Sequence, residues 1–483
     1  MIRQKPISVL CSFVVIALLR SVCAYAGPLV LSGEVTLRCE ADVPAVSLAV
    51  SDLMDDLERV LGKKARLVGA GAAAQVVVRI DSAAASTEGW VRETSSEAVT
   101  ISGSDPLGTV FGLYAFARTE LGIDPLWFWK ELPPERRGSI RLEPGRTEST
   151  GPTFRFRGWF VNDEDLLTEW QEPSGRRFIR YPFYEQVISL EVADRIFEAL
   201  LRSGGNLIIP ASFVDVMNPP EAALVRRAAE RGLYVTQHHI EPLGVSHFGF
   251  ENYWQRKGQP KTFRYGDDPE SVREVWRAFA AKWVELADDR VVWQLGLRGK
   301  ADRAIWSSDE SVSRADAGRA ISGAIAEQWE MIRELDPRPH PPATTTLWLE
   351  GAELMTEGSL TFPDGITIVF ADEGQSQQMQ QDFHTTARQP SRTYGVYYHV
   401  GFWSRGPHLL QGTTPHRVKE VFDQVIAKGD THYAIVNVCN IREHVLGIEA
   451  AMTAMHGPWD ADAFLRACSP PRLQEAYRLL MHS

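Results

Sequence analysis

The sequence has few cysteines, a deficit of positive charge and, after its first residues, no long hydrophobic run. Five cysteines in 483 residues are too few for a disulfide-rich scaffold. Lys and Arg total 51 against 62 Asp and Glu, a formal net charge of −11, which is not the footprint of a nucleic-acid-binding protein. No stretch after residue 26 approaches the roughly 20 apolar residues that span a bilayer, so no membrane anchor is expected. The hydrophobic content of 44% is typical of a globular protein and excludes disordered and fibrous classes.

The first 26 residues have the pattern of an export signal. Arg3 and Lys5 precede an apolar run from Ile7 to Leu19, and an Ala-Tyr-Ala sequence ends at Ala26. A basic start, a short apolar run and a small-residue cleavage site are the features of a signal peptide. The sequence therefore predicts cleavage near Ala26 and a secreted or periplasmic protein.

Three cysteines remain after such cleavage, namely Cys39, Cys439 and Cys468. An odd number cannot pair completely within one chain, and the spacing does not suggest a metal site. We expect mostly buried thiols, and one disulfide stays open because an exported protein meets an oxidising compartment.

Residues 27–150 are predicted to form a small α/β domain. Short β-branched runs alternate with segments in which apolar residues recur at helical spacing. A polar, turn-rich stretch at residues 145–153 suggests the boundary. The expected strands are Val35–Cys39, Val76–Ile80 and Val99–Gly103, and the expected helices are 45–57 and 108–116.

Eight apolar runs follow, and most of the intervals between them have helical periodicity. Strands that are apolar on both faces and alternate with helices favour parallel pairing. Eight such units predict a (β/α)₈ TIM barrel over residues 151–462, followed by a short helical tail at 463–483. An open doubly wound sheet is the alternative, although no Gly-rich phosphate loop follows the first strand. The expected strands are Phe156–Val161, Asn206–Ile209, Leu233–Gln237, Val291–Leu297, Thr344–Leu349, Ile366–Phe370, Tyr394–Tyr398 and Tyr433–Val438.

Polar residues collect where these predicted strands end. In a TIM barrel the carboxyl ends of all eight strands meet at one mouth, which is where barrel enzymes carry their chemistry. A ring of carboxylates, imidazoles and amides suits a polyhydroxylated ligand, and two carboxylates can serve as general acid and general base. The residues at the strand ends are Asn162, Asp163, Asp165, His238, His239, Glu241, Arg298, Lys300, Asp302, Glu350, Asp372, Glu373, Tyr398, His399 and Asn437.

Structural roles compete with these functional ones. Asn162 and Asp372 could cap the elements that follow them, and paired histidines often satisfy a core. A metal held by His238, His239 and Glu241 is the least favoured interpretation, because neighbouring side chains on a strand point to opposite faces. Glu350 ends an apolar run, where burial would raise its pKa as a general acid requires. An ion pair with Arg298 is the alternative for that glutamate.

Several segments resemble glycoside hydrolase family 115, the xylan α-1,2-glucuronidases. The resemblance covers roughly residues 30–460, and the order and spacing of its motifs are more specific than any one of them. Two loops depart from the family pattern: Lys300 stands where an acid is usual, and the strand-six loop reads Asp372-Glu373-Gly374-Gln375. The similar segments are Arg157–Asp165, Asn206–Pro210, His238–Pro242, Leu295–Gly299, Tyr397–His399 and Ile435–Val438.

The resemblance implies an exo-acting, inverting hydrolase that removes (4-O-methyl)glucuronic acid side chains from xylan. It implies Glu350 as general acid and Asp302 or Asp372 as base, with substrate contacts from the other strand-end residues. The substrate is then a polysaccharide or oligosaccharide, no cofactor or metal is expected, and a homodimer stays open. Two alternatives remain, a catalytically silent carbohydrate-binding barrel and a glycosidase for a different acidic sugar.

Overall fold

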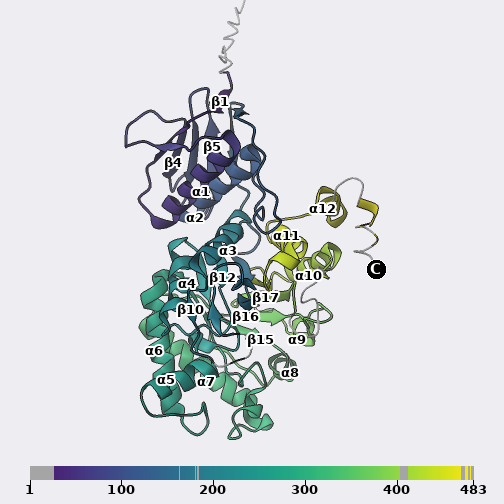
Figure 1. Ribbon diagram of the computed structural model, residues 1–483. Coiled ribbons are helices and arrows are strands. Elements are labelled where there is room, and N and C mark those ends of the chain that lie inside the picture. The colour runs from purple at the N-terminus through teal and green to yellow at the C-terminus, as the bar shows by residue number, and fades with distance from the viewer. Residues whose placement is uncertain are drawn as a thin grey trace, which may run out of the picture.

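The computed structural model describes residues 27–468, except 163, 180, 182–183 and 403–411, together with 474–476 and 479. The predicted signal peptide lies outside the described residues. Within that part of the chain, no helix is both long and apolar enough to cross a membrane. Figure 1 shows the N-terminal elements as one unit stacked on the end of a larger barrel.

The N-terminal unit is a six-stranded sheet covered by two helices. Its strand order is β3-β2-β4-β6-β5-β8, with parallel pairing from β3 to β6 and antiparallel pairing beyond. A separate two-stranded antiparallel sheet pairs β1 with β7, which lie far apart in the sequence. The elements are β1 (Leu29–Ser32), β2 (Thr36–Cys39), α1 (Pro44–Leu61), β3 (Arg66–Leu67), β4 (Val76–Ile80), β5 (Trp90–Thr94), β6 (Val99–Gly103), α2 (Pro106–Phe116), a π-helical turn (Ala117–Leu121), β7 (Ser139–Leu142) and β8 (Gly145–Glu148).

One segment expected to be a linker is a strand. Residues 145–148 form β8, which pairs with β5 at the sheet edge. All four residues are exposed, so the strand has no apolar alternation that would have revealed it. The division of the chain near residue 150 stays a prediction, with β8 ending just before it.

The second half of the chain is a closed barrel of eight parallel strands, as predicted. The strands follow the order β12-β13-β14-β15-β16-β17-β18-β9, and the pairing of β18 with β9 closes the ring. Gly158 of β9 is required by the close approach of β12, because a Cβ atom there would lie 1.6 Å from the carbonyl oxygen of Leu207. The strands are β9 (Phe156–Phe160), β12 (Leu207–Ile209), β13 (Tyr234–Thr236), β14 (Val291–Gln294), β15 (Ala343–Leu347), β16 (Ile366–Ala371), β17 (Tyr394–His399) and β18 (Tyr433–Asn437).

Helices surround the barrel and begin with capping signals. Ser189, Asp268, Ser313 and Thr414 each accept a hydrogen bond from the backbone N–H three residues on, which satisfies the first turn of α3, α6, α7 and α10. The helices are α3 (Leu190–Arg202), α4 (Pro219–Glu230), α5 (His247–Arg256), α6 (Pro269–Ala287), α7 (Arg314–Leu335), α8 (Glu350–Thr356), α9 (Gln381–Thr385), α10 (Pro415–Ala427), α11 (Val445–Ala454) and α12 (Ala461–Cys468).

Short elements lie in the loops. The β13–β14 connection, which is long in the sequence, contains both α5 and α6. The other short elements are a small hairpin of β10 (Gly175–Arg176) and β11 (Gln186–Val187) and the 3₁₀ turns Glu164–Leu167, Pro242–Gly244, Asp288–Arg290, Ile305–Ser307 and Arg442–His444.

The two largest of the apolar clusters among the described residues hold this arrangement. A small core fills the barrel interior with Phe160, Trp348 and Tyr397 among its members. A much larger core lies between the strands and the outer helices, and it continues into the N-terminal sheet. Cys439 is buried, whereas Cys39 is half-buried and Cys468 is exposed, and no disulfide joins these three thiols.

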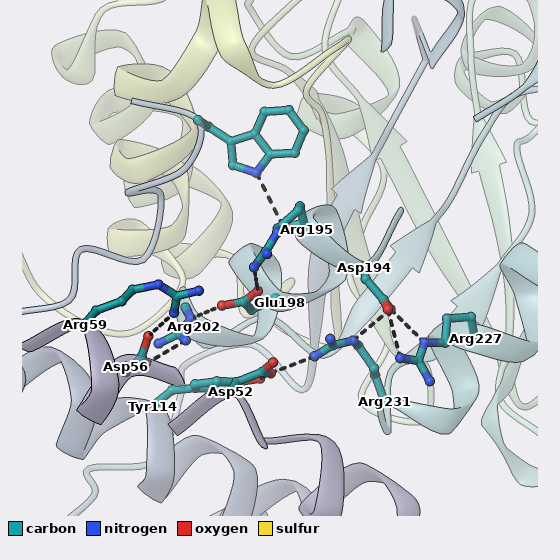
Figure 2. Close-up of polar contacts among 11 residues, drawn as sticks. Asp52, Asp56, Arg59, Tyr114, Asp194, Arg195, Glu198, Arg202, Arg227 and Arg231 are labelled. Carbon is teal, nitrogen blue, oxygen red and sulfur yellow. Dashed lines mark hydrogen bonds and ion pairs between the residues drawn. The ribbon is translucent and has the colours of Figure 1, made fainter. Parts of the chain in front are cut away.

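A buried charged network joins the N-terminal helices to the barrel, as Figure 2 shows. Arg202 of α3 forms ion pairs of 2.7 Å with Asp56 of α1 and with Glu198. Arg231, which follows α4, lies 2.8 Å from Asp52 of α1. Tyr114 of α2 donates a 2.6 Å hydrogen bond to the same Asp52. Helices α1, α2, α3 and α4 are therefore tied together by charge as well as by apolar packing.

Candidate active site

Backbone strain marks the carboxyl-end mouth of the barrel. Among the residues that the structure describes, eleven non-glycine residues have positive φ, and eight of them lie in the loops that follow barrel strands. Strained backbone of this kind concentrates at functional sites, where the surrounding structure holds it in place. The eight residues are Phe213, Leu243, Ala301, Asp302, Leu349, Gln377, Cys439 and Ile441.

A cleft of about 670 Å³ opens at this mouth. Seven of the predicted site residues line it: Asn162, His238, His239, Asp302, Glu373, His399 and Asn437. Its remaining walls are largely aromatic and come from Tyr181, Tyr184, Phe213, Trp348, Tyr397 and Phe402, with Ser212, Ile240, Ala301, Arg303, Leu349 and Gln375. Aromatic walls with a few polar groups are usual in sites that bind small molecules.

Arg298 links Glu350 to Asp302, the one member of this trio that lines the cleft. Its Nε donates to Asp302 Oδ1 at 2.6 Å, and its Nη1 donates to Glu350 Oε1 at 2.9 Å. Nη1 also donates to the carbonyl oxygen of Trp348 at 3.1 Å. The ion pair of Glu350 with Arg298, an alternative raised by the sequence, is therefore present. It does not remove Glu350 from the site, because the same guanidinium contacts the cleft-lining Asp302.

The two carboxylates have opposite pKa shifts. Burial raises the pKa of Glu350, and Arg298 only partly offsets that effect. Desolvation also acts to raise the pKa of Asp302, but Arg298 and His239 outweigh it and hold that pKa well below its usual range. His239 Nε2 lies 3.0 Å from Asp302 Oδ1. Two carboxyl groups whose environments separate their pKa values in this way suit one acid and one ionised partner.

Asp372 lies behind the cleft rather than in it. Its side chain is fully buried, Oδ1 lies 2.5 Å from His399 Nδ1, and Oδ2 accepts the backbone N–H of His399 at 3.3 Å. A carboxylate is an acceptor, so Nδ1 of His399 carries the proton and Nε2 is left for the cleft. This burial contradicts the expectation that Asp372 could be the base, and it makes Asp372 a positioning residue for His399.

The two neighbouring histidines of the β13 loop lie in the cleft wall, while Glu241 does not. Burial lowers the pKa of both His238 and His239. Glu241 is buried, and its Oε2 accepts the backbone N–H of Phe213 at 3.0 Å. Because that carboxylate fixes the β12 loop, Glu241 supports the wall and does not line the cleft.

Lys300 of the β14 loop points away from the carboxylate pair. Its Nζ lies 2.7 Å from both carboxylate oxygens of Glu251 on α5, and 4.9 Å from the ring centre of Phe248. This ion pair neutralises Lys300 and fastens the β14 loop to α5. The structure therefore does not place Lys300 in the cleft.

Strand parity decides which tyrosine faces the cleft. Tyr398 is fully buried between the strand and α10, where its ring packs edge-on against Phe422. Its neighbour Tyr397 points into the barrel interior and lines the cleft. Side chains alternate along a strand, so Tyr397 lines the cleft and Tyr398, the tyrosine expected there, does not. Asn437 Nδ2 donates to the Tyr397 hydroxyl at 3.2 Å.

The first strand end contributes Asn162. Its Oδ1 accepts from Ser212 Oγ at 2.6 Å, and its backbone oxygen accepts from Tyr184 at 2.9 Å. Asp163 lies outside the described residues, and Asp165 lies in the 3₁₀ turn Glu164–Leu167. Their roles stay predictions.

Residues missed by the sequence reasoning come from loops and strand interiors. Tyr181, Tyr184 and Phe213 form an aromatic cluster beside the cleft with Phe248. Arg303 directly follows Asp302 in the β14 loop. This position beside a predicted site residue is the sequence signal that could have identified Arg303. Trp348 precedes Glu350 by two residues and belongs to the interior core.

The closed barrel, with ionisable groups collected at its carboxyl-end mouth, is the architecture of a TIM-barrel enzyme. The chain belongs to glycosyl hydrolase family 115, because the family model matches residues 149–475. No curated protein sequence matches the chain.

Solved structures agree with this fold. A family GH115 4-O-methyl-alpha-glucuronidase with specificity for decorated arabinogalactans superposes with a TM-score of 0.76 at 21% identity, covering 92% of this chain. The present chain spans 60% of that protein. A β-hexosaminidase from Streptomyces plicatus has a TM-score of 0.59 at 11% identity, covering 94% of this chain and 92% of that one. An exo-β-N-acetylglucosaminidase from Vibrio harveyi has a TM-score of 0.57 at 10% identity, covering 94% of this chain and 75% of that one.

Proposed function

We propose that the protein is an exported, inverting exo-glycosidase that removes (4-O-methyl)glucuronic acid side chains from a xylan-like polysaccharide. The observation that carries the proposal is the single guanidinium of Arg298 between Glu350 and Asp302, two carboxylates with opposite pKa shifts. Membership of family 115 supports the reaction class.

In this proposal Glu350 is the general acid and Asp302 is the general base. Glu350 gives its proton to the leaving glycosidic oxygen as the bond to the anomeric carbon breaks. A water attacks that carbon from the opposite face, and Asp302 takes the proton of the water. The net result is hydrolysis with inverted configuration.

The spacing of the two carboxylates is compatible with inversion. Both contact one planar guanidinium, so the bonded oxygens are at most about 8 Å apart, given the small and rigid fork of an arginine. Inverting enzymes separate their carboxyl groups by roughly 6.5–9.5 Å to leave room for the water.

The Lys300–Glu251 ion pair favours an active enzyme over a silent binding barrel. A lysine that replaced an acid and faced the substrate would remove a catalytic charge. Here Lys300 is held by Glu251, and the Glu350–Arg298–Asp302 arrangement is complete without it.

Release of uronic acid from aldouronic oligosaccharides tests the proposal, with Glu350→Gln as the diagnostic variant. Glu353→Gln is the matched control, because Glu353 lies on the same helix and is exposed and paired with Arg314. We expect Glu350→Gln to lose at least a hundredfold in rate, in keeping with the usual contribution of general acid catalysis, and Glu353→Gln to stay near wild type. An equal loss in both variants, or an unchanged rate in Glu350→Gln, contradicts the assignment. A parallel assay of uronic acid release from decorated arabinogalactan determines which of the two polysaccharides is the substrate.

A further inference from the structure

An acidic substrate poses an electrostatic problem in this cleft. The acids Asp302 and Glu373 both line it, and they would repel the carboxylate of a uronic acid. A cation must therefore make the local electrostatic potential positive where the carboxylate of the sugar binds. This reasoning rests on the proposed function, because only an acidic sugar requires such a cation.

Five of the six cationic candidates near the cleft are already engaged or uncharged. His399, which lines the cleft, is hydrogen-bonded through Nδ1 to Asp372. Arg298 is shared between Asp302 and Glu350, and it is buried. Lys300 is paired with Glu251. Burial lowers the pKa of both His238 and His239, so that these imidazoles are neutral near neutral pH.

Arg303 is the remaining cation. It lines the cleft, its side chain is exposed, and no carboxylate of the described residues lies within ion-pair distance of it. We propose that Arg303 binds the carboxylate of the uronic acid and thereby determines specificity for acidic sugars. A guanidinium can hold a carboxylate by two parallel N–H bonds, which gives orientation as well as charge.

The backbone around Arg303 is fixed in advance of binding. The carbonyl oxygen of Arg303 accepts the N–H of Gly299 at 2.9 Å, and that of Asp302 accepts from Arg298 Nη2 at 3.1 Å. Lys300 N–H donates to Ser308 Oγ at 2.5 Å. A loop closed on itself in this way orders Arg303 beside the proposed base, so that only the side chain must be fixed when substrate binds.

The proposal is tested by binding rather than turnover, with titration calorimetry on the full chain. The probes are D-glucuronate and its methyl ester, which differ in one charge. We expect wild-type protein to bind glucuronate about tenfold to a hundredfold more tightly than the ester, the range for a charge-assisted hydrogen-bonded pair. Arg303→Gln should bind both equally, and Arg303→Lys should keep part of the preference.

Lys300→Met is the control, since it removes a neighbouring charge that the structure places outside the cleft. It should keep the preference for glucuronate. The proposal is overturned if a folded Arg303→Gln protein still prefers glucuronate over its methyl ester, or if the wild-type protein shows no such preference. If Arg303→Gln does not fold, the salt dependence of wild-type binding decides: glucuronate affinity must fall with ionic strength while ester affinity does not. Discrimination in binding without release of uronic acid would instead overturn the proposed hydrolysis and leave Arg303 in its role.

Discussion

Replacement of Arg202 by methionine is the sharpest test of how the N-terminal helices are held to the barrel. The Arg202 side chain is only 3% exposed. It pairs with Asp56 and Glu198, which are 0% and 5% exposed, and its guanidinium lies 4.6 Å from the ring centre of Tyr114 (Figure 2). Methionine fills much of the volume but leaves two buried carboxylates without their shared cation.

Removal of one partner from a buried ion pair costs about 3–5 kcal/mol, mainly because the remaining charge is desolvated and unpaired. We expect a cost at the lower end of this range for Arg202→Met at pH 7.5, because Asp56 keeps Arg59 at 3.1 Å and Glu198 keeps Arg195 at 3.0 Å. The cost should shrink toward pH 5. Burial raises the pKa of Asp56 to about 6, even with Arg202 present to oppose it, so this carboxyl can take up a proton when its partner is lost. Its charge penalty then disappears.

Urea unfolding followed by tryptophan fluorescence measures this change. Arg66→Met is the matched control, because Arg66 and Glu34 form a fully solvated pair with side chains 57% and 52% exposed. Solvated pairs contribute about 0–1 kcal/mol. If Arg202→Met costs no more than Arg66→Met, or if its cost grows toward low pH, the reasoning is refuted.

Two further predictions concern buried aspartates. Burial raises the pKa of the fully buried Asp382 to about 7, so its folded state holds a proton that the unfolded chain releases near pH 4. This contribution to stability is complete below pH 4 and is lost as the pH rises to 7. The free energy of unfolding of Asp382→Asn should therefore rise by about 2–4 kcal/mol relative to that of wild type between pH 4 and 8. A difference between the two proteins that stays constant with pH in urea unfolding would contradict this prediction. Asp372→Asn should switch His399 to the tautomer protonated at Nε2, which ¹⁵N NMR can observe. It should lower activity in the wild-type background but not in the His399→Gln background. An additive loss in the double variant would show that Asp372 acts directly and not through His399.

The barrel was predictable because its strands are buried on both faces and are separated by amphipathic helices. Runs such as Ile366–Phe370 have no polar face, which is characteristic of parallel strands under helices. The edge strand β8 and the short β3 were not predictable, because their side chains are exposed and only pairing with a neighbour makes them strands.

The site was predictable as a set of strand ends but not as a set of contacts. Parity along β17 turns Tyr397 inward and Tyr398 outward, and the sequence does not state which residue starts the alternation. Asp372 and His399 were both placed at the mouth, yet only the fold shows that one is buried behind the other. The loop closure that brings Arg303 into the cleft depends on Gly299 and Arg298, which no periodicity reveals.

The configuration of the first released sugar tests the central claim most directly. Glucuronoxylan is incubated with the protein, and the anomeric proton of the released uronic acid is followed by ¹H NMR before mutarotation. The proposed roles of Glu350 and Asp302, on opposite sides of the bond, predict that an α-linked uronic acid appears first as the β anomer, and that Glu350→Gln abolishes the signal. First appearance of the α anomer, or no uronic acid released by the wild-type protein, would contradict the account.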